Sequence, residues 1–394
     1  MKIVVFFDRF GPYHVARLNA ANSENHICGV ELTAVDHVYK WERVGDDSIS
    51  FDRINIGANA FAVSTASRGR VREVLASIGP DAVAIPGWSE QSSLYALLWC
   101  LDNGVPAVLM SESTEHDEPR KWWKEFIKKR IISCCSAALV GGKPHVAYMK
   151  RLGMSQDRIF TGYDVVDNDY FAKGAAKARA SRYELRKKFD LPEQYFLSSN
   201  RFIAKKNLSR LINAYSLYRQ RMGADAWNLV ILGDGELRLE LEELISELGL
   251  HDDVLLPGFK QYPDLPVYYG LASAYVHAST TEQWGLVVNE AMAAGLPVIV
   301  SERCGCAPDL VADGENGFVF DPYDVDLLSN LMLKISAKQA GLENMGKKSS
   351  EMISKLSPVA FAKGLAKASE RASFLPKTGG NFWDRFVVRL LALQ

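Results

Sequence analysis

The sequence of 394 residues lacks an apolar run long enough to cross a membrane. No stretch approaches the ~20 consecutive apolar residues of a transmembrane helix. A secretory signal core is also missing, because the short apolar run at residues 3–7 is halted at once by Asp8 and Arg9. We therefore expect a cytoplasmic protein, located in the cytosol or at the inner face of the cytoplasmic membrane.

The chain also has little net charge and few cysteines. The formal net charge is −1, which argues against a general nucleic-acid-binding protein, since such proteins are normally basic. Of the six cysteines, Cys134 and Cys135 are adjacent, and one residue separates Cys304 from Cys306, which is too tight for the usual zinc-site spacing. We expect reduced thiols rather than disulfides or a metal centre.

The length and the pattern of the chain favour two α/β domains. A chain of 394 residues is too long for one ordinary core. Short apolar runs that read as strands alternate with helical patterns in both halves, which is typical of doubly wound parallel sheets. Such sheets bind ligands beyond the carboxyl ends of their strands. The strands expected in this way lie at residues 3–7, 30–35, 82–85, 107–110, 137–140, 159–163, 195–199, 229–232, 254–256, 272–276 and 297–300.

The stretch from Ser279 to Val300 carries the most informative pattern. It begins in a loop after the strand expected at 272–276 and continues as a helix that stops near Gly295. Glu282 lies in the loop, and Glu290 follows eight positions later, about two helical turns on. If these carboxylates face the interior they need partners. The alternative is a solvated Glu290 and a Glu282 favoured only by the helix dipole.

This stretch resembles the retaining glycosyltransferases of the GT-B fold, and most closely the GT4 group, the glycosyl transferases group 1 family. The resemblance extends from about Leu197 to Asp321. It rests on the spacing Glu282-x7-Glu290, on Gly285-Leu286 inside it, and on Ala291-Met292-Ala293-x-Gly295-x-Pro297-Val298 after it. The resemblance implies two Rossmann-like domains that face a cleft. It further implies transfer of a sugar from a nucleotide-sugar, UDP- or GDP-linked, to a saccharide acceptor that is lipid-linked in many members, often in surface polysaccharide synthesis.

Donor binding is expected in the second half of the chain. Arg201 as a fork and Lys206 as a point charge, near a helix start, suit a diphosphate, although most such residues are surface cations. The resemblance makes them the clamp on the leaving diphosphate, so that no metal or other cofactor is required. It assigns Glu282 to the sugar ring and Glu290 to the ribose hydroxyls. The other donor-binding candidates are Gly233, Asp234, Gly235, Phe259, Gly285, Leu286 and Val287.

Acceptor binding is expected in the first half, where Gly11, His14 and His116 follow predicted strands. The expected domains are residues 1–170 for the acceptor and 171–375 for the donor, with residues 376–394 as a C-terminal helix that packs back on the first domain. Asp167-Asn168-Asp169 looks like the metal motif of the other glycosyltransferase fold, but its place in a linker argues against that interpretation.

Residues 120–132 mix basic side chains with Trp122, Trp123 and Phe126. Such a helix either lies on a membrane surface or packs its aromatic side chains on the domain and exposes its lysines. The amphipathic end at residues 382–393 raises the same two interpretations.

Two other classes of function stay open from the sequence. A sugar-nucleotide epimerase or a phosphorylase on the same fold would act without a separate sugar acceptor, or with phosphate. A non-catalytic ligand-binding protein is the other class. The sequence also leaves open whether retention proceeds on one face or through a covalent intermediate.

Overall fold

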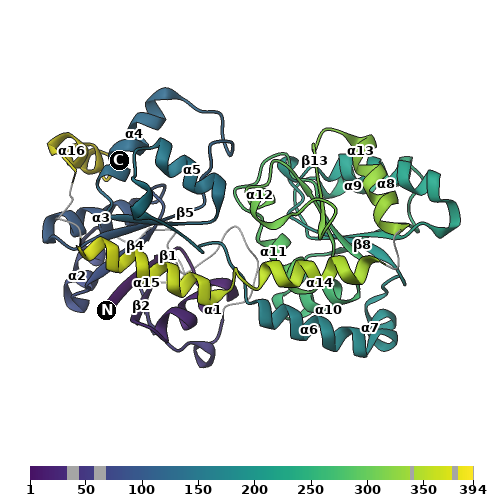
Figure 1. The fold of residues 1–394 in the computed structure, drawn as a ribbon, viewed down its shortest axis with the longest axis horizontal. Helices are drawn as coiled ribbons and strands as arrows, with labels where there is room; N and C mark the ends of the chain where they lie inside the picture. The colour runs from purple at the N-terminus through teal and green to yellow at the C-terminus, as the bar shows by residue number, and fades with distance from the viewer. Residues whose placement is uncertain (33–43, 57–67, 338–340, 375–379, 394) are drawn as a thin grey trace. The chain divides into compact units, whose positions relative to one another are not determined.

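The computed structural model describes residues 1–32, 44–56, 68–337, 341–374 and 380–393 (Figure 1). The chain divides into two compact units. The first comprises residues 1–166 together with 356–394, and the second comprises residues 167–355. Each unit holds one parallel sheet with helices packed against it, which confirms the two Rossmann-like domains expected from the alternating pattern.

The first unit contains a seven-stranded parallel sheet in the order β3-β2-β1-β4-β5-β6-β7. Its central strands are buried on both faces, as near-continuous apolar runs require. The strand order reverses direction between β1 and β4, so the carboxyl ends of these strands form a switch point. The strands are β1 (Lys2–Phe7), β2 (His26–Glu31), β3 (Asp52–Asn55), β4 (Ala82–Pro86), β5 (Ala107–Ser111), β6 (Ala137–Val140) and β7 (Ile159–Thr161).

Seven α-helices of the described residues belong to this unit: α1 (Pro12–Asn22), α2 (Arg68–Ile78), α3 (Gln91–Asn103), α4 (Trp122–Ser133), α5 (Lys143–Arg151), α15 (Pro358–Phe374) and α16 (Phe382–Leu391). Short 3-10 turns lie at η1 (Asp46–Ser48) and η2 (Gln156–Arg158). The second strand begins earlier than the sequence suggested, at His26 rather than Val30. Residues 33–35 of the expected strand lie outside the described residues.

The domain boundaries differ from those expected. The first crossing falls between residues 166 and 167, and the chain returns to the first unit at residue 356 rather than after 375. The reason is the apolar face of α15, whose Phe361, Leu365 and Ala368 are buried in the same core as α1 and the sheet. Gly364 lets this helix approach closely, because a Cβ there would lie 2.4 Å from the Thr161 carbonyl oxygen. The C-terminal helix α16 packs on α3 and α4 of the first unit.

The second unit contains a six-stranded parallel sheet in the order β10-β9-β8-β11-β12-β13. The order reverses between β8 and β11, which makes their carboxyl ends the switch point. The strands are β8 (Tyr195–Ser199), β9 (Asn228–Leu232), β10 (Val254–Gly258), β11 (Ala274–His277), β12 (Val298–Ser301) and β13 (Gly317–Phe320). The α-helices are α6 (Asn168–Ala180), α7 (Arg182–Phe189), α8 (Leu208–Met222), α9 (Arg238–Glu247), α10 (Leu265–Leu271), α11 (Leu286–Ala293), α12 (Ala307–Leu310), α13 (Val325–Ser336) and α14 (Leu342–Ile353), with 3-10 turns η3 (Ala204–Lys206), η4 (Gly223–Asp225) and η5 (Tyr262–Asp264).

The Asp167-Asn168-Asp169 segment is the start of α6. The Asp167 carboxylate accepts a hydrogen bond from the Tyr170 N–H at 3.0 Å, and Asp169 pairs with Lys173 at 2.8 Å. These acids therefore cap a helix and complement its dipole. Among the helices of the described residues, none combines the length and the apolar character that crossing a bilayer requires.

Replacing Gly364 by Ala should destabilise the first unit, because the added methyl group must displace α15 from the Thr161 carbonyl. Overpacking of this kind costs about 1–3 kcal/mol. Thermal unfolding followed by calorimetry measures the change, with Lys363→Ala on the exposed side of the same helix as the control. An unchanged transition in Gly364→Ala would contradict the assignment of α15 to the first unit's core.

Candidate functional site

The loop between β11 and α11 is a fixed structure rather than a free connection. Trp284 is buried and donates its indole N–H to Asn289 at 2.9 Å. The Glu282 N–H donates to the Arg303 carbonyl at 3.2 Å, and the Gly305 N–H donates to the Glu282 carbonyl at 3.0 Å. The loop is therefore bonded to the turn after β12, and its residues hold defined positions at the carboxyl edge of the sheet.

Gly285 ends this loop and caps α11 with a φ of +104°, in the region that favours glycine. A Cβ there would also lie 3.5 Å from the Glu282 side chain and 3.6 Å from the ring of His277. The following residues, Leu286 and Val287, are half-buried in the first turn of the helix. The first N–H groups of a helix have no partner within it, so this end suits an anion.

Lys206 and Glu282 form an ion pair through Nζ and Oε2, and their side chains are only 12% and 15% exposed. Lys206 comes from the turn after β8, so the pair joins two loops at the switch point. The buried Asn207 fixes this turn, since its amide donates to the carbonyls of Ala278 at 3.0 Å and Pro322 at 2.8 Å. The Thr280 N–H donates to the Lys205 carbonyl at 2.9 Å. The two charges are thus held together by backbone as well as by attraction.

His277 and Ser279 complete the surroundings of Glu282. The Ser279 hydroxyl donates to Glu282 Oε2 at 3.4 Å and lies 3.2 Å from His277 Nε2. Because the hydroxyl gives its proton to the carboxylate, its oxygen accepts from the ring, which places a proton on Nε2. Both residues are fully buried. No pattern in the sequence indicated them, because a histidine and a serine at the end of a strand carry no spacing signal of their own.

The electrostatics favour a charged Glu282 beside a neutral histidine. Burial opposes ionisation of Glu282, but the hydrogen bond with His277 and the charge of Lys206 outweigh it and lower the pKa of the carboxyl well below its usual range. Burial, together with the charge of Lys206, lowers the pKa of His277. At neutral pH the site therefore holds one carboxylate and one ammonium group.

The loops after β8 and β9 lie against each other. The Phe202 N–H donates to the Asp234 carbonyl at 2.9 Å. Gly233 has a φ of +129°, and a Cβ there would lie 1.7 Å from the Asn200 carbonyl oxygen, so the approach requires glycine. The half-buried Arg201 directly follows Asn200 in the loop after β8.

The other donor-binding candidates lie at the same edge of the sheet. Asp234 and Gly235 are exposed, and Asp234 pairs with Arg238 at 3.8 Å. Phe259 is half-buried just after β10. Backbone and side chains from the ends of β8, β9, β10 and β11 therefore gather in the second unit.

Glu290 is 1% exposed on α11, which excludes the solvated-residue interpretation. Burial and the charge of Glu290 raise the pKa of Tyr262 and of Tyr275. The Tyr262 ring stacks on Tyr170 with centroids 4.6 Å apart. The sequence pattern identified Glu290 but gave no sign of these tyrosines.

In the first unit, Gly11 and His14 form the start of α1. The Gly11 N–H donates to His14 Nδ1 at 3.1 Å, and the imidazole lies against Phe7 with centroids 4.3 Å apart. Burial and the nearby Arg17 charge lower the pKa of His14 to about 3, so it is neutral. His116 is exposed in a loop that Arg120 organises through Thr114 and Asp117. The structure does not bring His116 into this cluster.

A buried polar group that includes Arg17 lies beside His14. Arg17 is 1% exposed, donates to the Val165 carbonyl at 3.0 Å and lies over the Tyr163 ring at 5.2 Å. Burial and the neighbouring Glu112 raise the pKa of Asp164 well above its ordinary value. These side chains lie at or just beyond the carboxyl ends of β1, β5 and β7, the edge at which such sheets bind ligands.

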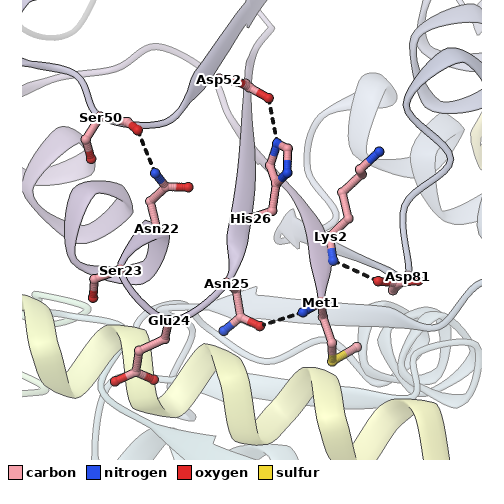
Figure 2. A pocket seen from close by; sticks show the side chains of 10 residues that line it. All are labelled: Met1, Lys2, Asn22, Ser23, Glu24, Asn25, His26, Ser50, Asp52 and Asp81. Atoms are coloured by element: carbon pink, nitrogen blue, oxygen red, sulfur yellow. Dashed lines mark hydrogen bonds and ion pairs between the residues drawn. The ribbon is translucent and has the colours of Figure 1, made fainter.

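A polar depression of about 690 Å³ lies at the opposite edge of this sheet (Figure 2). The donor atoms of His26, Cys28 and Asp52 lie there within 4.8 Å of one another. His26 Nε2 and Asp52 Oδ2 are already 2.7 Å apart, and burial with the charge of Asp52 raises the pKa of the Cys28 thiol to about 11. Because the strands begin here, we assign this depression no part in the site. All six cysteines are buried and free.

Residues 181–352 match the model of the family described as glycosyl transferases group 1. The chain is 28% identical over 179 residues to mannosylfructose-phosphate synthase of Agrobacterium fabrum, covering 44% of this chain and 38% of that protein. It is 31% identical over 178 residues to a GDP-mannose-dependent phosphatidylinositol monomannoside mannosyltransferase of Mycobacterium tuberculosis, covering 43% and 44%. The matched part thus spans less than half the length of these relatives.

The fold is that of GT-B proteins. Sucrose-phosphate synthase of Thermosynechococcus elongatus superposes with a TM-score of 0.73 at 19% identity, covering 93% of this chain and 97% of that one. The HepE protein of Anabaena, solved in complex with UDP, gives a TM-score of 0.71 at 17% identity, covering 93% and 98%. At these identities the likeness establishes the fold.

Replacing Lys206 by Met should destabilise the second unit by about 3 kcal/mol, because Glu282 then stays buried without its cation. The double variant Lys206→Met with Glu282→Gln should recover part of this loss. Urea unfolding measures both, and Lys205→Met, at the exposed neighbouring lysine, is the matched control. If the double variant loses as much stability as Lys206→Met and Glu282→Gln together, the two side chains are not coupled and the prediction is wrong.

The lowered pKa of Glu282 also predicts how stability changes with acid. The unfolded carboxyl takes up its proton near pH 4.3, before the folded one does, so the stabilisation is complete above that pH and is lost as pH falls toward the folded pKa. Between about pH 5 and pH 2 the wild-type chain should therefore lose more stability than Glu282→Gln. Parallel unfolding curves against pH would refute this.

Proposed function

We propose that the protein transfers a sugar from a nucleotide-sugar to a saccharide acceptor, because residues 181–352 match the glycosyl transferases group 1 family. The observation that carries this proposal is the fixed Lys206–Glu282 pair at the switch point of the second sheet, with Arg201 on the adjoining loop. Relatives named as mannosyl- and kanosaminyltransferases support the same class of reaction.

We place the donor entirely in the second unit. Arg201, Lys206 and the first N–H groups of α11 at Leu286 and Val287 would bind the diphosphate. Glu290 would accept hydrogen bonds from the ribose. The Gly233–Gly235 backbone and Phe259 would line the nucleoside side. The donor we expect is a UDP- or GDP-sugar, and the UDP complex of the Anabaena neighbour supports testing UDP first.

The mechanism we propose rests on charge rather than on a metal. Arg201 and Lys206 neutralise the leaving diphosphate as the bond to the anomeric carbon breaks. Glu282 stays ionised and stabilises the positive charge that develops on the sugar ring. Its contacts with Ser279 and Lys206 hold it in place before the donor arrives, so little reorganisation is needed during reaction. We expect the anomeric configuration to be retained, with the same-face route and the covalent route both compatible with this arrangement.

We place the acceptor in the first unit, at the edge where Gly11, His14 and Arg17 meet Asp164. The His14 imidazole is neutral, so it adds no positive charge beside Arg17 and can still exchange hydrogen bonds with a sugar hydroxyl. The acceptor class that fits is a saccharide, free or lipid-linked, in polysaccharide or glycolipid synthesis.

The decisive experiment is calorimetric titration with UDP, GDP and ADP in the absence of metal. One diphosphate should bind. Arg201→Ala, and Arg201→Lys to a lesser degree, should weaken binding by at least about tenfold, since one charge-assisted contact contributes roughly 1.5–3 kcal/mol. Lys206→Ala should do the same, whereas Lys205→Ala should bind normally. If none of the three binds, with or without metal, the proposed diphosphate site is incorrect.

Product analysis then separates the transferase from the other reactions this fold could support. Incubation with the cognate nucleotide-sugar and a saccharide acceptor should yield a new glycoside with the donor's anomeric configuration. An altered nucleotide-sugar would indicate an epimerase, and a sugar phosphate formed from added phosphate would indicate a phosphorylase.

A further inference from the structure

The exposed large apolar side chains of the described residues are unevenly distributed. Fifteen such side chains are exposed, and seven of them lie on α4 and α16 of the first unit. The two helices pack against each other (Figure 1). Arg130 on α4 bonds Asp384 on α16 at 2.9 Å. We call these seven side chains the aromatic face. They are Trp122, Trp123, Phe126, Phe382, Trp383, Phe386 and Leu390.

The helix α16 is apolar on two opposite sides. Val388 and Ala392 are buried in the core of the first unit. Phe382, Phe386 and Leu390 recur every fourth residue, so they form a stripe along the other side, and between 47% and 75% of each is exposed. An exposed stripe of this kind marks a surface that another apolar phase covers.

The charges around the aromatic face are basic. Lys121, Lys124, Lys129 and Arg389 are exposed on or beside these helices. The acidic members turn inward: the Tyr148 hydroxyl donates to Glu125 at 2.9 Å, and Asp384 is buried against Arg130. Two exposed acids pair with these cations: Asp102 with Arg389 at 3.1 Å, and Glu118 with Lys124 at 4.0 Å. The region is thus positive although the whole chain carries a net charge of −1.

We propose that α4 and α16 together form one docking surface for a membrane of anionic lipids. Tryptophan and phenylalanine side chains suit the boundary between headgroups and acyl chains, and flanking lysine and arginine side chains attract anionic headgroups. The cations Lys124 and Arg130 lie near the rings of Trp123 and Phe126, at 5.9 Å and 4.7 Å from the ring centres. Basic side chains therefore lie next to the apolar ones on this surface, as a helix that lies in a membrane interface requires.

A second copy of the chain fits this surface less well. A symmetric contact would place the same basic groups opposite each other, and like charges across an interface are unfavourable.

The helices α4 and α16 have 12 and 10 residues, so they are too short to cross a membrane and would lie in the plane of its surface.

Vesicle co-sedimentation tests this proposal without any sugar substrate, so its outcome is independent of the proposed function. The wild-type chain should bind phosphatidylcholine vesicles that contain about 30% phosphatidylglycerol, and binding should fall as salt increases. Pure phosphatidylcholine vesicles should bind at least tenfold more weakly. Tryptophan emission should shift to shorter wavelength on binding to the anionic vesicles.

Matched variants locate the surface. Trp383→Ser with Phe386→Ser should weaken vesicle binding at least tenfold. Tyr183→Ser with Leu239→Ser removes two comparably exposed apolar side chains from the second unit and should have no effect. Lys124→Glu with Lys129→Glu should abolish the preference for anionic lipid, whereas Lys347→Glu should preserve it. Circular dichroism checks that each variant is folded.

Three results would overturn the proposal. One is equal binding to neutral and anionic vesicles, or none to either. Another is undiminished binding by the Trp383→Ser, Phe386→Ser variant. The third is a dimer in sedimentation equilibrium that the same substitutions disperse, because the aromatic face would then belong to an interface between copies of the chain.

Discussion

The ion pair between Lys206 and Glu282 is the constraint around which the second unit is arranged. Keeping a carboxylate and an ammonium group mostly out of water is costly unless their geometry is fixed. The chain fixes it with backbone and amide bonds from Asn207 and Thr280, and with the hydroxyl of Ser279. These bonds join the loops after β8 and β11, so they fix the ion pair at the carboxyl edge of the sheet. This is the edge at which we propose that a negatively charged donor binds. A diphosphate would compete with Glu282 for Lys206 rather than meet an unpaired cation, and this competition couples donor binding to the position of the carboxylate.

The two units treat buried charge in opposite ways. In the second unit, Lys206 keeps Glu282 ionised although it is largely buried. In the first unit, burial and Glu112 raise the pKa of Asp164, and burial lowers that of His14. The first edge therefore offers neutral hydrogen-bonding groups beside Arg17, and the second offers fixed charges. Neutral hydroxyls of a saccharide suit the former and a phosphorylated donor suits the latter, which agrees with the division of acceptor and donor that we propose.

The sequence was informative wherever a local pattern carried the constraint. The alternation of strands and helices predicted both sheets, and the family resemblance carried by the Glu282-x7-Glu290 pattern singled out both carboxylates, although the spacing alone left a solvated Glu290 open. The sequence was uninformative where the partner of a side chain lies far away along the chain. His277 acts on Glu282 only because the loop folds back, and Asp164 meets Arg17 across 147 positions of sequence. The boundary at residue 356 could not be predicted either, because the apolar face of α15 fits a helix of either domain. Only the structure shows Phe361 and Leu365 in the first unit's core and Gly364 against Thr161.

The aromatic face bears on the acceptor through the loop that joins them. Glu112, beside Asp164, begins the segment that runs from β5 into α4. Arg120 ties this segment together: it bonds the Thr114 carbonyl and Asp117, pairs with Glu125 of α4 at 3.5 Å, and lies over Tyr148 at 4.7 Å. The polar edge and the aromatic face of the first unit are therefore parts of one braced structure. If the aromatic face lies on lipid, the acceptor edge is held at a fixed distance from that lipid by the same bonds. A saccharide carried on a lipid would meet this requirement, whereas a freely diffusing saccharide would gain nothing from it.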